Sequence, residues 1–257
     1  MTTDDGNSFR EKVLYYDNFG KHTETVQVGH SPKGKELTFT LGYDILERNV
    51  GESLPMPDGN RNYYGDAYYY SGCVYGNSSL NRIRETYGPG AAWIENGKSV
   101  KTEYLINADS GELSCAEFRA EDNGEDVRLI RSGLYAAGEL SVARTTDEDG
   151  KVVYTFTDFE GKLLLTRRMN GTEPHDTYSV YDDRGRKRIV LPPLAADELT
   201  ATASWGCNSS EVIKKYGYVY RYDSRDRVIE KKLPGCDPVH FVYDRSDRLI
   251  LKQNGNN

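Results

Sequence analysis

Two stretches near the end of the chain repeat one phrase: "YRYDSRDRVIEKKLPG" at residues 220–235 and "VYDRSDRLILKQNG" at residues 242–255. In each, a Tyr-Asp pair is followed by two variable residues, an Asp and an Arg, and then by an apolar run. The spacing between Asp223 and Asp244 leaves room for a strand, a return turn and a second strand. A repeat of this size indicates a fold that is built from one supersecondary unit.

The same phrase occurs seven times along the chain. The copies begin at Tyr16, Tyr43, Thr146, Thr157, Tyr181, Tyr222 and Tyr243. The second residue is always Asp: Asp17, Asp44, Asp147, Asp158, Asp182, Asp223 and Asp244. The fifth residue is Gly in four copies (Gly20, Gly150, Gly161, Gly185) and Glu47, Asp226 or Asp247 in the others. The sixth residue is always Lys or Arg.

Each position of the phrase has a physical reason. Tyr and Thr favour strands, and an Asp carboxylate accepts hydrogen bonds from backbone N–H groups just ahead of it. Gly adopts a positive φ at little cost, and Asp tolerates it better than most residues. The apolar run that follows is typical of a strand. Each phrase is therefore predicted to be the tip of a β-hairpin.

The rest of the chain agrees with an all-β meander of hairpins. Asn96-Gly97 predicts a turn that leads into a strand. Two stretches, residues 78–88 and 194–204, are expected to be short helices, and the "VLPPLAAD" stretch is expected to mark a boundary or a corner.

Composition excludes several classes of protein. A net charge of −7 argues against non-specific nucleic-acid binding, which needs clustered Lys and Arg. No apolar run is long enough to predict a transmembrane helix, and the first residues lack the apolar core of a signal peptide. Cys207 and Cys236 either form a disulfide in an exported protein or, with Cys73 and Cys115, are free thiols that pack as small apolar residues.

No motif for catalysis, a cofactor or a metal is found, so the chain is expected not to be an enzyme. The four His residues are interpreted as surface or packing residues. "TDEDGK" from Thr146 lacks the later Glu of a calcium loop, and "EDNGED" from Glu121 is expected to be an exposed loop.

One segment is rich in aromatic residues. The candidate binding residues are Tyr63, Tyr64, Tyr68, Tyr69, Tyr70 and Trp93. Aromatic faces beside amides and acids can stack on sugars or other flat ligands. The alternative is that these side chains form the core and the cross-strand pairs of a sheet.

The repeated phrase resembles the YD repeat of the Rhs/YD-repeat family. Further stretches such as "YYDNFGKHTETVQVG", "YYGDAYYYSGCVY" and "YDDRGRKRIVLPPLA" resemble the N-terminal region of Rhs-type wall-associated proteins of Bacteroidetes. The acidic residues Glu47, Asp226 and Asp247 depart from the family's turn Gly and are expected to weaken their turns.

The resemblance implies stacked hairpins that form a curled sheet or a partial β-shell. It implies an exported or cell-surface protein in which residues 1–170 and 171–257 form one continuous β assembly that encloses or displays a C-terminal effector. The alternative is a module that binds carbohydrate or a cell surface through the tyrosine-rich face. The first strand, in "KVLYYD", and the last, in "RLILKQ", are expected to be sheet edges that loops cover or that pair with another copy.

Overall fold

The computed structural model describes residues 11–124 and 126–255. The chain forms two compact units: unit 1 contains the residues up to 102 together with 146–150, and unit 2 contains 103–145 and the residues from 151. Both units are almost entirely antiparallel β-structure, which confirms the expected all-β meander. The division at residue 170 remains a prediction.

Unit 1 is a succession of paired strands. They are β1 (Lys12–Tyr16), β2 (His22–Gln27), β3 (Leu37–Tyr43), β4 (Asn49–Ser53), β5 (Met56–Pro57), β6 (Tyr70–Tyr75), β7 (Ile83–Tyr87) and the start of β8 (Val100–Ile106). β1 pairs with β2, β2 with β3, β3 with β4, β4 with β6, β6 with β7 and β7 with β8. A short helix, α1 (Ala91–Ile94), lies between β7 and β8.

Unit 2 continues the meander and adds a second sheet. The repeat strands are β11 (Ser141–Thr146), β12 (Val152–Thr157), β13 (Leu163–Asn170), β14 (Glu173–Tyr181), β15 (Lys187–Leu191), β17 (Tyr218–Tyr222), β18 (Val228–Lys232), β19 (Val239–Tyr243) and β20 (Leu249–Gln253). The second sheet contains β9 (Ala116–Asn123), β10 (Asp126–Leu134) and β16 (Ser204–Gly206). Helices α2 (Pro193–Glu198) and α3 (Glu211–Tyr216) and the 3₁₀ turn Gly111–Leu113 complete the unit.

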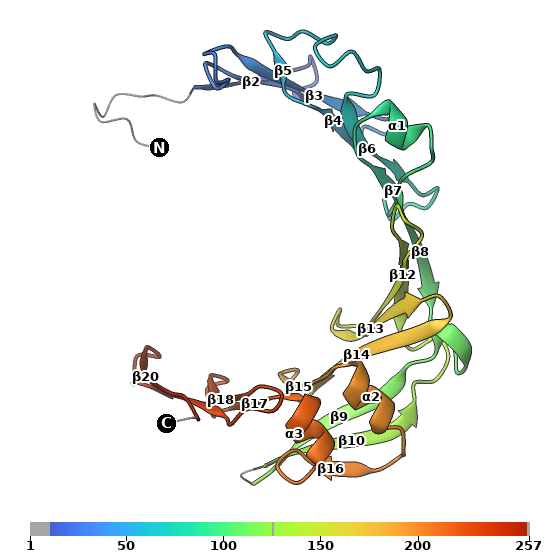
Figure 1. Cartoon of the computed structure of the whole chain (residues 1–257). Coiled ribbons are helices and arrows are strands. Elements are labelled where there is room, and N and C mark those ends of the chain that lie inside the picture. Colours follow the sequence, from blue (N-terminus) through green and yellow to red (C-terminus); the bar gives the residue numbers. More distant parts are fainter. Residues whose placement is uncertain (1–10, 125, 256–257) are drawn as a thin grey trace. The chain divides into compact units, whose positions relative to one another are not determined.

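The apolar core lies in unit 2, beside strands β14 and β15. Figure 1 shows α2, α3 and the sheet β9-β10-β16 next to these strands. Side chains such as Phe156, Leu165, Ile189 and Leu129 are fully buried there. Unit 1 has few buried apolar side chains among its described residues, notably Val26 and Met56. The sheet of unit 1 must therefore be held together largely by contacts within the sheet itself.

The expected helix at residues 78–88 is wrong, because this stretch contains strand β7. Asn81 adopts a left-handed φ of 50°, and Ile83, Glu85 and Tyr87 then alternate along the strand. The expected helix at 194–204 is confirmed only as α2, which begins at Pro193, where Pro at the first helical position is favourable. Three short α-helices lie among the described residues rather than the one or two expected.

Other local expectations can be compared with the structure. The turn at Asn96-Gly97 is followed by β8, and Gly97 has a φ of 65°. The stretch from Glu121, expected to be an exposed loop, instead forms the end of β9 and the turn into β10 around Gly124. All four cysteines are free thiols; Cys207 is buried and Cys236 is exposed. None of the described helices is long and apolar enough to cross a membrane.

All seven phrases form the same turn. The Asp carboxylate accepts the backbone N–H of the residue two positions on, as Asp223 does from Arg225 at 2.9 Å. The fifth residue has a left-handed φ in every copy, from 59° at Asp226 to 80° at Gly161. The strand register shifts at the Tyr or Thr in the copies whose pairing is defined, as at Tyr222. This is a type I turn followed by a left-handed residue and a β-bulge.

Gly161 offers a direct measure of the backbone requirement. A Cβ at this position would meet no atom within 4 Å, so only the left-handed φ of 80° opposes a side chain. We expect Gly161→Ala to lower the free energy of unfolding by about 1–2 kcal/mol, and Gly161→Asn to lower it less because Asn tolerates this conformation. Urea unfolding of the three proteins measures both changes. Equal losses for Ala and Asn would contradict the backbone explanation.

Candidate functional site

The hairpin tips are joined to one another by the tyrosine of the repeated phrase. The hydroxyl of Tyr222 donates a hydrogen bond of 2.8 Å to the carbonyl of Lys187, the residue that follows the base of the preceding turn. The same bond joins Tyr43 to His22, Tyr181 to Leu163 and Tyr243 to Val228. The tyrosine therefore ends its own strand and also fixes the adjacent hairpin.

The basic sixth residue makes the second contact between tips. The Arg186 guanidinium lies 5.3 Å from the centre of the Tyr222 ring, and Arg227 lies 4.8 Å from the Tyr243 ring. Lys21 is placed in the same way over Tyr43, at 4.8 Å. A cation over a tyrosine face is attracted by the ring quadrupole. Arg186 and Arg227 also pair with their own turn residues, Asp182 and Asp223, so each of these arginines contacts both its own turn and the next hairpin.

The same bases also explain the acidic residues at left-handed positions. Lys21 pairs with Glu47 at 3.1 Å, Arg186 with Asp226 at 2.9 Å, and Arg227 with Asp247 at 2.7 Å. In each pair, the acid is the fifth residue of the turn that follows. The expectation that these acids only weaken their turns therefore omitted a compensating ion pair.

Sequence comparison within the chain missed one further tip of this kind. Tyr75 ends β6 and donates a hydrogen bond of 2.9 Å to the carbonyl of Asn49. Arg48 lies 4.3 Å from the Tyr75 ring and donates to Asn81, whose φ is left-handed. The signal in the sequence was a Tyr followed, after a longer loop, by Asn81-Arg82. Its Tyr and its left-handed residue were separated by more residues than the phrase allows.

A buried charge cluster ties the second sheet of unit 2 to the hairpin tips. The Arg188 side chain is 1% exposed and pairs with Asp182, at 3.1 Å, and with Asp122 of β9. It also donates to the carbonyl of Tyr220 at 3.0 Å. Asp182, whose side chain is also buried, pairs with Arg186 at 2.8 Å. Asp182 therefore neutralises the buried Arg188 as well as accepting the hydrogen bonds of its own turn.

These contacts set the charge state of Asp182. Burial alone would raise its pKa, but hydrogen bonds from Arg186 and Arg188 outweigh burial and hold the pKa below the ordinary Asp value. Hydrogen bonding to Arg188 likewise lowers the pKa of Asp122. The folded state therefore favours the charged, deprotonated form of both carboxyl groups.

The candidate tyrosine-rich face is not one surface in the structure. Tyr63 and Tyr64 line a cavity of about 630 Å³ beside the Lys35–Asp58 ion pair. The Tyr64 hydroxyl there is bonded to the carbonyl of Pro55 at 2.6 Å. Trp93 lies on α1 with 47% of its surface exposed and lines neither this cavity nor the one formed by Tyr69 and Tyr70.

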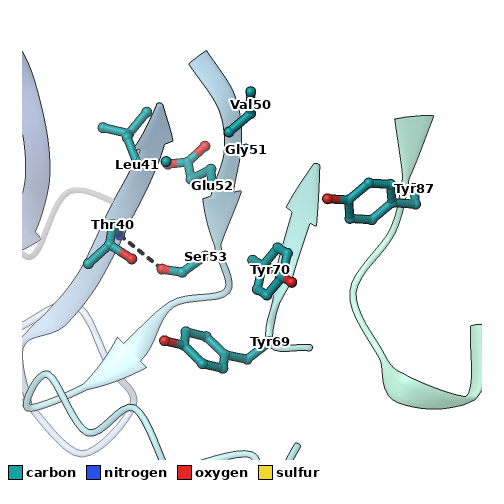
Figure 2. Close-up of a pocket in the computed structure, with 10 residues that line it drawn as sticks. Thr40, Leu41, Val50, Gly51, Glu52, Ser53, Tyr69, Tyr70 and Tyr87 are labelled. Carbon is teal, nitrogen blue, oxygen red and sulfur yellow. Dashed lines mark hydrogen bonds between the residues drawn. The ribbon is translucent and has the colours of Figure 1, made fainter. Parts of the chain in front are cut away.

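Tyr69 and Tyr70 line a second cavity of about 270 Å³, together with Tyr87, which sequence reasoning missed. Figure 2 shows Tyr70 between Ser53 of β4 and Tyr87, whose ring extends from β7. The Tyr70 ring is nearly perpendicular to the Tyr69 ring, at a centroid distance of 6.1 Å, and it is tilted by 71° against the Tyr87 ring at 6.3 Å. Tyr68 is half-buried and its ring is 6.3 Å from that of Tyr70.

The described residues contain no group of three or more His, Cys, Asp or Glu side chains arranged to hold a metal ion. Burial raises the pKa of the Cys115 and Cys207 thiols to about 12, so these buried thiols remain protonated at neutral pH.

Comparisons with known proteins agree with this architecture. A family model described as "Domain of unknown function (DUF6443)" matches residues 1–106. No curated protein sequence matches the chain. Among solved structures, a chain in the crystal structure of TcdB2-TccC3-Cdc42 superimposes with a TM-score of 0.58 at 12% identity over 96% of this chain. A chain of the Photorhabdus luminescens Tc holotoxin pore gives 0.58 at 11% identity over 95%.

This chain has the fold of a segment of those larger chains. It spans about 11% of the length of each of them. The two matches support the Rhs-like resemblance at the level of fold.

The tyrosine bond between tips can be tested by removing one oxygen atom. We expect Tyr222→Phe to lower the free energy of unfolding by about 1 kcal/mol, because the Lys187 carbonyl loses its donor while the ring is kept. Tyr218→Phe, on the same strand, is the matched control, since the Tyr218 hydroxyl has no hydrogen-bond partner among the described residues. Urea unfolding measures both. A Tyr222→Phe protein as stable as the control would contradict a role in joining the hairpins.

The charge cluster predicts an acid-sensitive fold. Because the pKa of Asp182 is lowered in the folded state, its stabilising effect is present above the ordinary Asp pKa, 3.8, and is lost as the pH falls through the lower folded value. We expect Asp182→Asn to cost about 1.5–3 kcal/mol at pH 7 and to reduce the stability difference between pH 7 and pH 3. The exposed neighbour gives the control Asp183→Asn. Urea unfolding at both pH values is the measurement; an unchanged pH dependence would contradict this assignment.

Proposed function

We propose that the chain is a non-enzymatic structural segment of a larger, exported Rhs-type polypeptide. In this role its hairpins form part of the wall of a β-shell that encloses or displays an effector. The observation that carries the proposal is the repeated contact between hairpin tips. One tyrosine hydroxyl, one base and one turn residue join successive hairpin tips in the same way at Tyr43, Tyr222 and Tyr243.

A shell wall of this kind requires many hairpins in succession, and the contacts between tips can be repeated from one hairpin to the next. In the last three repeats, Arg186 and Arg227 each reach forward to the next turn, and Tyr222 and Tyr243 each reach back to the preceding one. A further hairpin of this pattern can therefore be added without a new kind of interface. The sheet of unit 1 also suits a wall, because few of its described apolar side chains are buried.

The last repeat presents the groups that a further hairpin would use. Arg248 is 78% exposed and its partner among the described residues is Asp244 of its own turn. Strand β20 pairs with β19, and its Leu249, Ile250 and Leu251 are exposed. An apolar edge strand of this kind invites pairing. We propose that its partner is another hairpin of the same pattern, in the same polypeptide.

The structural neighbours support this role without establishing it. One of them is a Tc holotoxin pore, and the chain matches a small part of each protein. Export, the enclosed effector and the link to a longer polypeptide are therefore parts of the proposal.

The size and location of the native polypeptide test this proposal. We expect an antibody raised against this chain to detect, in fractionated source cells, a surface or secreted band well above the 29.0 kDa of the chain. The purified chain is the size control, and a cytosolic enzyme controls for lysis. A band near 29.0 kDa, or one confined to the cytosol, would overturn the shell role.

A second candidate function is carbohydrate binding through part of the tyrosine-rich face. One observation favours it: Tyr69 and Tyr70 line a cavity rather than packing into a closed core. The two candidates are compatible, because a shell wall can carry a ligand site on one face.

A further inference from the structure

The cavity lined by Tyr69, Tyr70 and Tyr87 lies beside a row of paired glycine residues. The strand register places Gly42 of β3 beside Gly51 of β4, Gly51 beside Gly72 of β6, and Gly72 beside Tyr87 of β7. Three neighbouring strands therefore have no side chain at this level. Gly42 and Gly51 line the cavity. A Cβ at Gly51 would lie only 2.2 Å from the backbone carbonyl oxygen of Ser71, so this glycine allows β4 and β6 to approach closely.

The glycine at position 72 determines where Tyr87 lies. A Cβ at this position would be 2.5 Å from the Tyr87 hydroxyl oxygen and 2.6 Å from the ring carbon that bears it. The far end of the Tyr87 ring thus occupies the place of the missing side chain. In Figure 2 the ring points from β7 towards Tyr70. Gly72 is the residue that allows Tyr87 to serve as a wall of the cavity.

The tyrosine hydroxyls of this cavity differ from those of the repeated phrase. The hydroxyls of Tyr43, Tyr222 and Tyr243 all donate hydrogen bonds to backbone carbonyls. Those of Tyr69, Tyr70 and Tyr87 have no hydrogen-bond partner within the described part of the chain. Burial raises the pKa of Tyr87, so its hydroxyl is protonated and can donate. The hydroxyls of these three tyrosines therefore take no part in joining one hairpin to the next.

A buried serine adds one more polar group. Ser53 is 6% exposed and lies opposite Tyr70 in the strand register. Its hydroxyl oxygen accepts the backbone N–H of Thr40 at 2.9 Å, as Figure 2 shows. The hydroxyl hydrogen has no acceptor among the residues that the structure describes. It remains available to a group in the cavity.

The charge and size of the cavity restrict its ligand. Its lining contains one acid, Glu52, and no Lys, Arg or His, so an anionic ligand is disfavoured. A volume of about 270 Å³ is slightly below the range of about 300–1,000 Å³ that is usual for drug-sized ligands. Aromatic faces combined with several free hydroxyls match a ring that has both C–H faces and hydroxyl groups.

We propose that this cavity is a subsite for one neutral sugar ring. The Tyr69 ring stacks on its C–H face, the perpendicular Tyr70 ring borders its edge, and the hydroxyls of Tyr69, Tyr87 and Ser53 bond to its hydroxyls. The inference rests on the second candidate function for its ligand class and is independent of the shell role. It differs from the sequence-based candidate set by including Tyr87, Gly72 and Ser53 and by leaving out Tyr63, Tyr64 and Trp93.

The test uses the whole chain and a panel of neutral methyl glycosides: glucoside, galactoside, mannoside and N-acetylglucosaminide. We expect at least one to give saturation-transfer NMR signals and a measurable Kd. Tyr69→Ala should weaken that binding about tenfold or more, and Tyr69→Phe, which keeps the ring, by a smaller factor. Gly72→Ala should also weaken binding, because its Cβ displaces the Tyr87 ring.

Controls separate loss of the site from loss of the fold. Tyr63→Ala removes an exposed tyrosine outside the cavity and should leave Kd unchanged. Thermal unfolding of every variant verifies the fold, and Tyr69→Phe remains informative if Tyr69→Ala unfolds. Sialic acid serves as the anionic probe and should not bind. The proposal is overturned if no glycoside binds, if cavity variants bind as well as Tyr63→Ala, or if sialic acid binds more tightly than the neutral sugars. None of these outcomes bears on the size of the native polypeptide.

Discussion

The fold depends on the contact between one hairpin tip and the next. A single hairpin of this length is marginally stable in water. Unit 1 contributes little apolar core with which to stabilise it. At Tyr43, Tyr222 and Tyr243, a hairpin gains from its neighbour a hydrogen bond from the tyrosine hydroxyl to a carbonyl, a base over the ring, and an ion pair between turns. Each contact is weak alone. Because all of them form at the hairpin tips, together they hold neighbouring hairpins in register beside the backbone hydrogen bonds of the sheet.

The turn itself could be predicted from the sequence, because its causes are local. An Asp that accepts nearby N–H groups and a residue with left-handed φ lie within six positions, so a single stretch contains all the information. The compensation at Glu47 could not be predicted in the same way. Its partner, Lys21, belongs to the preceding turn and lies in another strand pair. A substitution that looks unfavourable within one repeat is explained only by the contact between repeats.

The same distinction explains the errors. Residues 78–88 have the composition of a short helix, but their strand is fixed by pairing with β6 and by Tyr87 over Gly72. The tyrosines at 63–70 are adjacent in sequence, yet they are divided between two cavities because the chain turns between them. Tyr87 joins Tyr70 through strand pairing alone. Residues that meet across a sheet leave no periodic signal along the chain.

The two roles of tyrosine in this chain have different requirements. In the repeated phrase, the hydroxyl must meet a carbonyl of the neighbouring hairpin, which fixes its position and uses its one donor hydrogen. Around this row of glycines, no carbonyl meets the hydroxyls of Tyr69, Tyr70 and Tyr87 within the described residues, and the paired glycines of β3, β4 and β6 have no side chain. Glycine residues in this row keep the backbone hydrogen bonds of the sheet intact, because these bonds do not involve side chains. A sheet held together at its hairpin tips can therefore carry a cavity on one face without losing the contacts that stabilise it.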